Sequence, residues 1–130
     1  MNLRPIAPNL WHDTAEGPRL LGARRDDGSI TFPVPEGAAE TGLERVELSP
    51  RGTLWSWTTQ DFRPKSPYEG PEPFEPYIVG YVELPGEMIV ETRIVRASLD
   101  QLSVDLPMRL VVEPFDQERS IFAFTPEEVQ

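Results

Sequence analysis

The sequence predicts a mainly β protein built around one small closed barrel. Three features predict it: 15 prolines in 130 residues, short runs that alternate between apolar and polar side chains, and turn signals between those runs. Proline has no backbone N–H and breaks helix interiors, so this composition disfavours a helical protein. A chain of this length fits a single domain with one core of its own.

Five strands are expected in the second part of the chain. They cover residues 53–60, 77–84, 87–95, 108–113 and 119–124. Leu84-Pro85-Gly86-Glu87 predicts a type II turn, because proline presets φ at the first central position and glycine accepts a positive φ at the second. One helical turn at 98–102 is expected between the third and fourth strands. This pattern is typical of a five-stranded Greek-key barrel, the OB-fold, over residues 48–126.

The first 47 residues give weaker signals. Residues 9–17 predict a helix within an N-terminal segment 1–19, since Asn9 can cap it and Gly17-Pro18 can end it. Residues 20–47 show no sustained period and few large apolar side chains, so we expect them to be irregular and to pack on another part of the protein. Residues 127–130 form an acidic tail that is expected to fray.

The net charge of −10 is unevenly distributed. Residues 66–130 carry 4 basic and 13 acidic side chains, whereas residues 1–65 are nearly balanced. DNA and RNA are bound largely through Lys and Arg, so this distribution disfavours general nucleic-acid binding. An OB module for single-stranded nucleic acid remains the alternative interpretation, and it requires a basic groove beside stacking aromatic rings.

The chain has no cysteine, which excludes disulfides, thiolate nucleophiles and cysteine-based metal sites. No run approaches 18 apolar residues, and the first residues lack the charged-then-apolar pattern of a signal peptide. We therefore expect a cytoplasmic protein without a membrane span.

Catalytic motifs are not found in the sequence. His12 is the one histidine, and no serine motif accompanies it as a nucleophile. The carboxylates are numerous but form no acid–base pair, and there is no glycine-rich phosphate loop. A small enzyme in its own right is thus disfavoured, no catalytic residue is assigned, and a binding or scaffolding role is expected.

Aromatic side chains are the main indication of a binding surface. They cluster on the first two strands and in the loop 62–76 between them: Trp55, Trp57, Phe62, Tyr68, Phe74, Tyr77 and Tyr81. Trp and Tyr are enriched at protein interfaces, and a proline-stiffened loop loses little entropy on docking. We expect these residues except Tyr81, together with Pro64 and Pro71, to contact a partner. Alternation places Trp55 and Trp57 on one face, although one of them can instead fill the barrel.

Basic side chains of the first half form a second group. Arg19, Arg24, Arg25, Arg51, Arg63 and Lys65 can meet a phosphate if folding gathers them, and otherwise they are solvated surface charges.

Four segments carry a family resemblance. In LLGARRDDGSITFPVPEGAAETG the agreement is at Leu21, Gly22, Arg24, Gly28, Phe32, Pro33 and Gly42. VELSPRGTLWSWT, EPYIVGYVELPGE and SIFAFTP follow in the order and spacing of the same pattern. From Leu20 to Pro126 the chain resembles the domain of unknown function 35 family, in which a zinc ribbon precedes an OB-fold and which is called acyl-CoA-associated.

The resemblance implies a ribbon at 20–47 that has lost its metal. The four zinc positions fall near Arg25, Asp27, Ala38 and Thr41, and these side chains cannot form a tetrahedral zinc site. We expect no zinc and no other cofactor.

The resemblance also implies a partner enzyme. Family members are accessory subunits of thiolase-superfamily thiolases and aldolases, including those of steroid side-chain breakdown, or of MaoC-like enoyl-CoA hydratases. We expect a non-catalytic subunit of such a hetero-oligomer in lipid metabolism, which meets acyl-CoA through its partner. Arg24, Arg25, Arg51 and Lys65 are the candidate contacts to the CoA phosphates.

Overall fold

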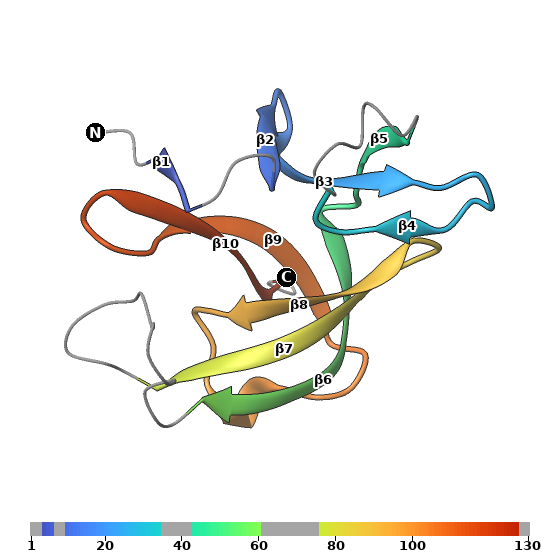
Figure 1. Cartoon of the computed structure of the whole chain (residues 1–130). Coiled ribbons are helices and arrows are strands. Elements are labelled where there is room, and N and C mark those ends of the chain that lie inside the picture. The colour runs from blue at the N-terminus through green and yellow to red at the C-terminus, as the bar shows by residue number, and fades with distance from the viewer. Residues whose placement is uncertain (1–3, 7–9, 35–42, 61–75, 128–130) are drawn as a thin grey trace.

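A closed barrel of five strands forms the larger part of the molecule (Figure 1). The computed structural model describes residues 4–6, 10–34, 43–60 and 76–127. The barrel strands are β6 (Arg51–Gln60), β7 (Tyr77–Leu84), β8 (Met88–Ile94), β9 (Pro107–Pro114) and β10 (Arg119–Pro126). The predicted strands are confirmed, with small differences at their ends.

The strand order identifies the barrel type. The strands follow the order β10-β8-β7-β6-β9, and pairing between β9 and β10 closes the ring. All pairings are antiparallel except that of β8 with β10, which is parallel at Ile94 and Phe124. A 3₁₀ helix, η1 (Leu99–Gln101), separates β8 from β9. This is the predicted OB-fold with its helical interruption.

The β7–β8 hairpin has the predicted turn. Gly86 has φ +71°, and the Glu87 N–H donates to the Leu84 carbonyl at 3.0 Å. A side chain at position 86 would be strained in this conformation, so the glycine sets the hairpin register.

A second sheet lies across the barrel and carries the N-terminal part of the chain (Figure 1). Its strands are β2 (Trp11–Thr14), β3 (Gly17–Arg24), β4 (Ile30–Thr31) and β5 (Glu44–Glu47), and β3 pairs with the other three. A short strand, β1 (Arg4–Pro5), is separate from this sheet and adds in parallel to β10.

The predicted helix at 9–17 is wrong. Residues 11–14 are a strand, and a tight turn leads into β3 through Gly17, whose φ is +114°. The Thr14 hydroxyl donates to the Gly17 carbonyl at 2.8 Å and accepts the Glu16 N–H at 3.2 Å. Trp11 and Phe122 of the barrel are arranged edge to face, with ring centroids 6.3 Å apart. Side-chain hydrogen bonds and a tertiary contact thus outweigh the weak local helix signal.

The irregular structure expected for residues 20–47 is also wrong in part. Leu20, Leu21 and Ala23 are buried on β3, and β4 and β5 pair beside them. The expected packing on another part of the protein is confirmed, because Leu20 belongs to the barrel core. The buried members of that core are Leu20, Leu48, Leu54, Val82, Leu84, Val90, Ile94, Leu102, Met108, Leu110 and Phe124.

Candidate functional site

A β-bulge in β6 separates its two tryptophans. The pairing of β6 with β7 shifts between Leu54 and Ser56, so Leu54 is fully buried and Trp57 packs against the core. Trp55 instead points outward with 55% of its surface exposed. The predicted placement of both tryptophans on one face is wrong because the extra residue of a bulge reverses the alternation. Trp57 is partly buried and packs against the core, so the alternative, in which one of them fills the barrel, stays a prediction.

Trp55 lies beside Tyr81 on the neighbouring strand, and the loop before β9 is bonded to the residue that precedes Trp55. Its ring meets Tyr81 of β7 edge to face, with centroids 6.4 Å apart. The Asp105 N–H donates to the Leu54 carbonyl at 2.7 Å, which holds the loop before β9 against β6. Val104 in this loop is 62% exposed. We call Trp55, Tyr81 and Val104 the tryptophan face.

Acidic side chains border the tryptophan face. Glu91 of β8 lies opposite Tyr81, and Glu83 of β7 lies two residues further along the strand, both exposed. Asp105 follows Val104 and is also exposed. The face is therefore apolar at its centre and negative at its edge. Sequence analysis singled out Trp55 but missed Val104, because a valine in an irregular loop carries no signal of exposure.

Tyr77 lies at the other end of β7, in a stack of rings and guanidinium groups. The Arg93 guanidinium carbon is 3.8 Å from the centroid of the Tyr77 ring and 5.3 Å from that of Phe115. The Arg119 guanidinium carbon is 5.1 Å from the Phe115 centroid. Tyr77 is thus engaged within the fold, and its contact with a partner stays a prediction.

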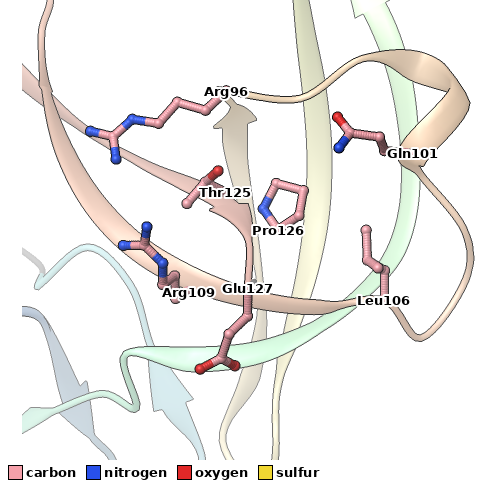
Figure 2. A pocket seen from close by; sticks show the side chains of 7 residues that line it. All are labelled: Arg96, Gln101, Leu106, Arg109, Thr125, Pro126 and Glu127. Carbon is pink, nitrogen blue, oxygen red and sulfur yellow. The ribbon is translucent and has the colours of Figure 1, made fainter. Parts of the chain in front are cut away.

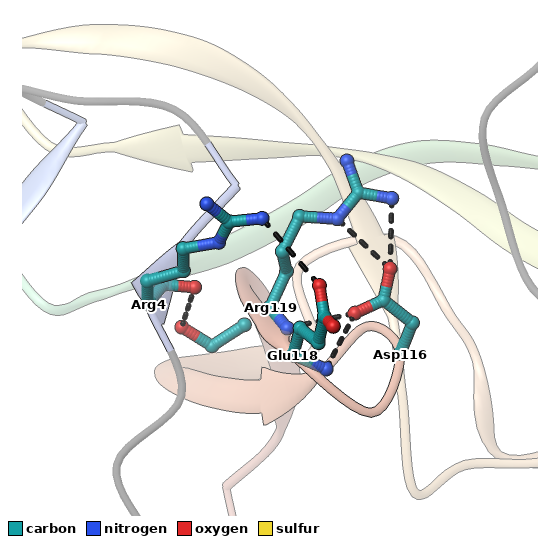
Figure 3. Close-up of polar contacts among 5 residues, drawn as sticks. Arg4, Asp116, Glu118 and Arg119 are labelled. Atoms are coloured by element: carbon teal, nitrogen blue, oxygen red, sulfur yellow. Dashed lines mark hydrogen bonds and ion pairs between the residues drawn. The ribbon is translucent and has the colours of Figure 1, made fainter.

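Charge pairs hold the β9–β10 turn beside this stack (Figure 3). Asp116 accepts the backbone N–H groups of Glu118 and Arg119 at 2.9 and 2.7 Å and the Arg119 guanidinium at 2.7 to 2.8 Å. Arg4 of β1 lies 3.6 Å from Glu118. The hydrogen bond from Arg119, followed by those from the backbone, lowers the pKa of Asp116 below its usual value. Asp116 therefore stabilises the turn as a carboxylate and is unsuited to accept a proton at neutral pH.

The predicted basic group does not share one site. Arg24 is 4.0 Å from Glu44 in the N-terminal sheet, and Arg51 is 2.7 Å from Glu127 after the barrel. Arg25 lies in the β3–β4 turn, where its carbonyl accepts the Gly28 N–H at 2.9 Å. Lys65 lies outside the described residues. Arg24 therefore pairs with a carboxylate of the N-terminal sheet, and Arg51 pairs with a carboxylate that follows the last barrel strand.

Several predicted partner contacts also fall outside the described residues, namely Phe62, Pro64, Tyr68, Pro71 and Phe74. Their part in binding stays a prediction.

His12 contacts a carboxylate on a neighbouring strand. Its Nε2 lies within hydrogen-bonding distance of Glu47 on β5, and both side chains are more than two-fifths exposed. This exposed polar contact joins β2 to β5 within the N-terminal sheet.

The ribbon positions show no metal ligands in the described part of the chain. Asp27 in the β3–β4 turn binds the hydroxyl and the N–H of Ser29, and these hydrogen bonds lower the pKa of its carboxyl group. Ala38 and Thr41 lie outside the described residues. Among the described residues, no three His, Cys, Asp or Glu side chains gather to hold a metal ion. The expectation that this segment binds no zinc stays a prediction.

Comparisons with known proteins agree with the OB-fold. The model of the ChsH2 C-terminal OB-fold domain family matches residues 45–113, more than half of the chain. A solved structure described as the Ltp2-ChsH2(DUF35) aldolase has a TM-score of 0.61 and 23% sequence identity. The match covers 83% of this chain and 84% of that one.

No curated protein sequence matches this chain. Within the described part, no helix has the length and apolar character that a membrane span requires. From the family match and the closed barrel, we conclude that this chain belongs to the ChsH2 C-terminal OB-fold family, which is of the domain of unknown function 35 type.

Proposed function

We propose that this chain is a non-catalytic accessory subunit that binds a thiolase-superfamily enzyme, a thiolase or aldolase acting on acyl-CoA thioesters, through the tryptophan face. The observation that carries the proposal is the 55% exposure of Trp55. A large ring held on a rigid strand is the kind of side chain that supplies most of the energy at protein interfaces. The aldolase complex described for the structural relative supports an enzyme of this class as the partner.

The acidic border of the tryptophan face indicates which kind of partner surface is complementary to it. Glu83, Glu91 and Asp105 surround the rings, so a complementary partner surface carries Lys or Arg around an apolar hollow. Such charge pairs at a rim mainly increase the association rate, and salt weakens them. We therefore expect the complex to form more slowly as the salt concentration rises.

The titratable groups support a non-catalytic role. Among the carboxyl groups of the described residues, those with shifted pKa values are Asp27 and Asp116, and both are shifted downward. A general acid or base for neutral pH needs a carboxyl pKa that is raised. His12, the one histidine, is exposed and contacts Glu47. We infer that the chemistry takes place on the partner.

Two alternatives have less support. A MaoC-like hydratase as the partner has no support from the comparisons. Binding of single-stranded nucleic acid is disfavoured because Glu83 and Glu91 lie on the outer face of β7 and β8, where OB-folds place such ligands. Arg93 shares this face and is stacked on Tyr77.

We propose smaller contributions from the remaining predicted residues. The loop residues Phe62, Pro64, Tyr68, Pro71 and Phe74 add contacts to the partner. Contacts of Arg24 and Arg51 with CoA phosphates require exchange of their carboxylate partners, Glu44 and Glu127, for the ligand.

The test is co-purification from the native host with identification of the bound protein by mass spectrometry. We expect a thiolase-superfamily enzyme with the unchanged chain. Trp55→Ala is expected to weaken the isolated complex at least about tenfold, the effect of losing one interface anchor. Glu91→Lys is expected to weaken it less, and Glu16→Lys, which makes the same charge change on the distant β2–β3 turn, is expected to leave it unchanged.

Three outcomes would contradict the proposal. Recovery of a hydratase alone would show that the partner is a hydratase and not a thiolase-superfamily enzyme. Unchanged binding by Trp55→Ala in a folded protein would remove the tryptophan face from the interface. Turnover of an acyl-CoA thioester by the isolated chain would show that the chain is itself an enzyme.

A further inference from the structure

A polar pocket of about 460 Å³ opens on the outer side of the barrel between β9, β10 and η1 (Figure 2). This volume lies in the range of small-molecule sites. Its lining comprises Arg96, Gln101, Leu106, Arg109, Thr125, Pro126 and Glu127. None of these residues belongs to the tryptophan face.

Two arginines are on the same side of this pocket. Arg109 lies opposite Thr125 in the pairing of β9 with β10, and the guanidinium group of Arg96 extends toward the same side, whereas the Glu127 carboxylate points away from both (Figure 2). Glu127 is bound to Arg51 at 2.7 Å, and Arg96 is paired with Glu113. Each nearby carboxylate is thus engaged by a different arginine.

Arg109 has no ion-pair or hydrogen-bond partner for its guanidinium group in the described part of the chain. It is nevertheless half-buried on β9, directly opposite Arg51 of β6 in the antiparallel register. Like charges in directly opposed positions destabilise a sheet. The fold therefore keeps a positive charge in an unfavourable position at the pocket.

Two arginines at one pocket are unusual in this half of the chain, which is mostly acidic. Residues 66–130 contain four arginines, and two of them, Arg93 and Arg119, are engaged in the stack around Phe115. The other two face the pocket. A site that concentrates positive charge in an acidic half of the chain is suited to an anion.

We infer that this pocket binds a small organic phosphate. A phosphate group carries up to two negative charges at neutral pH and accepts paired hydrogen bonds from guanidinium groups, so one phosphate matches Arg96 and Arg109 together. Thr125 adds a hydroxyl donor. The Gln101 oxygen accepts the Ser98 N–H at 2.8 Å, which leaves its amide nitrogen to donate.

The apolar side of the pocket points to an organic group on the phosphate. Leu106 and Pro126 line it opposite the arginines (Figure 2). A ring or short chain attached to the phosphate would cover these side chains, because apolar surface gains from being removed from water. This inference goes beyond the proposed function and is independent of it, since it concerns the chain without a partner.

The test is calorimetric titration of the isolated full-length chain with pyrophosphate and with ADP at constant ionic strength. We expect saturable one-to-one binding of both, with ADP at least as tight as pyrophosphate, and no binding of adenosine. Arg109→Gln is expected to weaken both affinities at least about tenfold, the effect of losing one charged hydrogen bond. Arg45→Gln is the matched control, because Arg45 is an exposed arginine on β5 away from the pocket, and it is expected to bind as the unchanged chain does.

A second readout keeps the inference testable if binding is weak. Without ligand and at low salt, Arg109→Gln is expected to melt at the same temperature as the unchanged chain or higher, because the repulsion with Arg51 is removed. With pyrophosphate, only chains that keep Arg109 are expected to gain in melting temperature.

Four results would overturn the inference: no saturable binding, equal binding by Arg109→Gln, equal loss in Arg45→Gln, or citrate binding as well as pyrophosphate. Co-purification with an enzyme is a separate measurement, so either result can fail while the other stands.

Discussion

The barrel and the N-terminal sheet are held in different ways. Barrel strands bury side chains against one another, as Val82, Val90 and Phe124 do from three different strands. Leu20 of the N-terminal sheet belongs to that same core. The rings of Trp11 and Phe32 pack against Phe122 of the barrel. The barrel therefore supports the N-terminal sheet, and we expect the two to unfold together.

The largest effect is expected from opening the barrel core. Phe124→Ala removes a fully buried ring on β10, and such changes lower the free energy of unfolding by about 3–5 kcal/mol. Urea unfolding followed by circular dichroism measures this value. Phe124→Leu, which keeps most of the volume, is expected to cost much less, and equal losses in the two variants would argue against tight packing at this position.

The next largest effect tests whether the barrel and the N-terminal sheet unfold as one cooperative unit. Leu20→Ala lies in the N-terminal sheet but deletes a fully buried core side chain, so it is expected to cost about 2–4 kcal/mol. Unfolding should remain a single transition, with faster hydrogen exchange in both sheets. Loss of the N-terminal sheet with an unchanged midpoint for the barrel would show that the sheets are independent.

Much of the barrel could be predicted from the sequence, whereas the N-terminal sheet could not. Barrel strands repeat apolar residues and end at turn signals such as Pro85-Gly86, so their information is local. Trp11 and Leu20 become ordered through contacts with residues far along the chain, and a local pattern does not record such contacts.

For the candidate site, the sequence predicted the type of residue but not which residue is exposed. Aromatic residues on the first strands indicated a binding surface, and Trp55 is part of it. The bulge after Leu54 decides which tryptophan is outside, and alternation alone gave the wrong answer. The pocket of Arg96 and Arg109 joins residues from the β8–η1 connection and from β9, which no sequence spacing connects.

The two tryptophans of β6 test the bulge as a pair, with a smaller expected loss of stability. Trp57→Ala is expected to cost about 2 kcal/mol because Trp57 packs on the core, whereas Trp55→Ala is expected to cost at most about 1 kcal/mol through its contact with Tyr81. Thermal and urea unfolding of both variants measure the difference. The reverse order would place Trp55 inside the barrel.

The smallest effect concerns the turn between β9 and β10. The lowered pKa of Asp116 means that its carboxylate stabilises the fold in full above about pH 4, the ordinary aspartate value, and that this contribution is lost as the pH falls through the lowered pKa. Asp116→Asn is therefore expected to be less stable than the unchanged chain at pH 7, with the difference shrinking in acid. Melting curves between pH 7 and pH 2 test this expectation, and a difference that does not depend on pH would show that the charge of Asp116 has no part in it.

The most direct test of the docking proposal is amide hydrogen exchange of this chain alone and bound to its partner enzyme. The account predicts slower exchange on binding at residues 53–57, 79–83 and 103–106, around Trp55, with little change at residues 11–24. Protection confined to the N-terminal sheet, with none around Trp55, would contradict it.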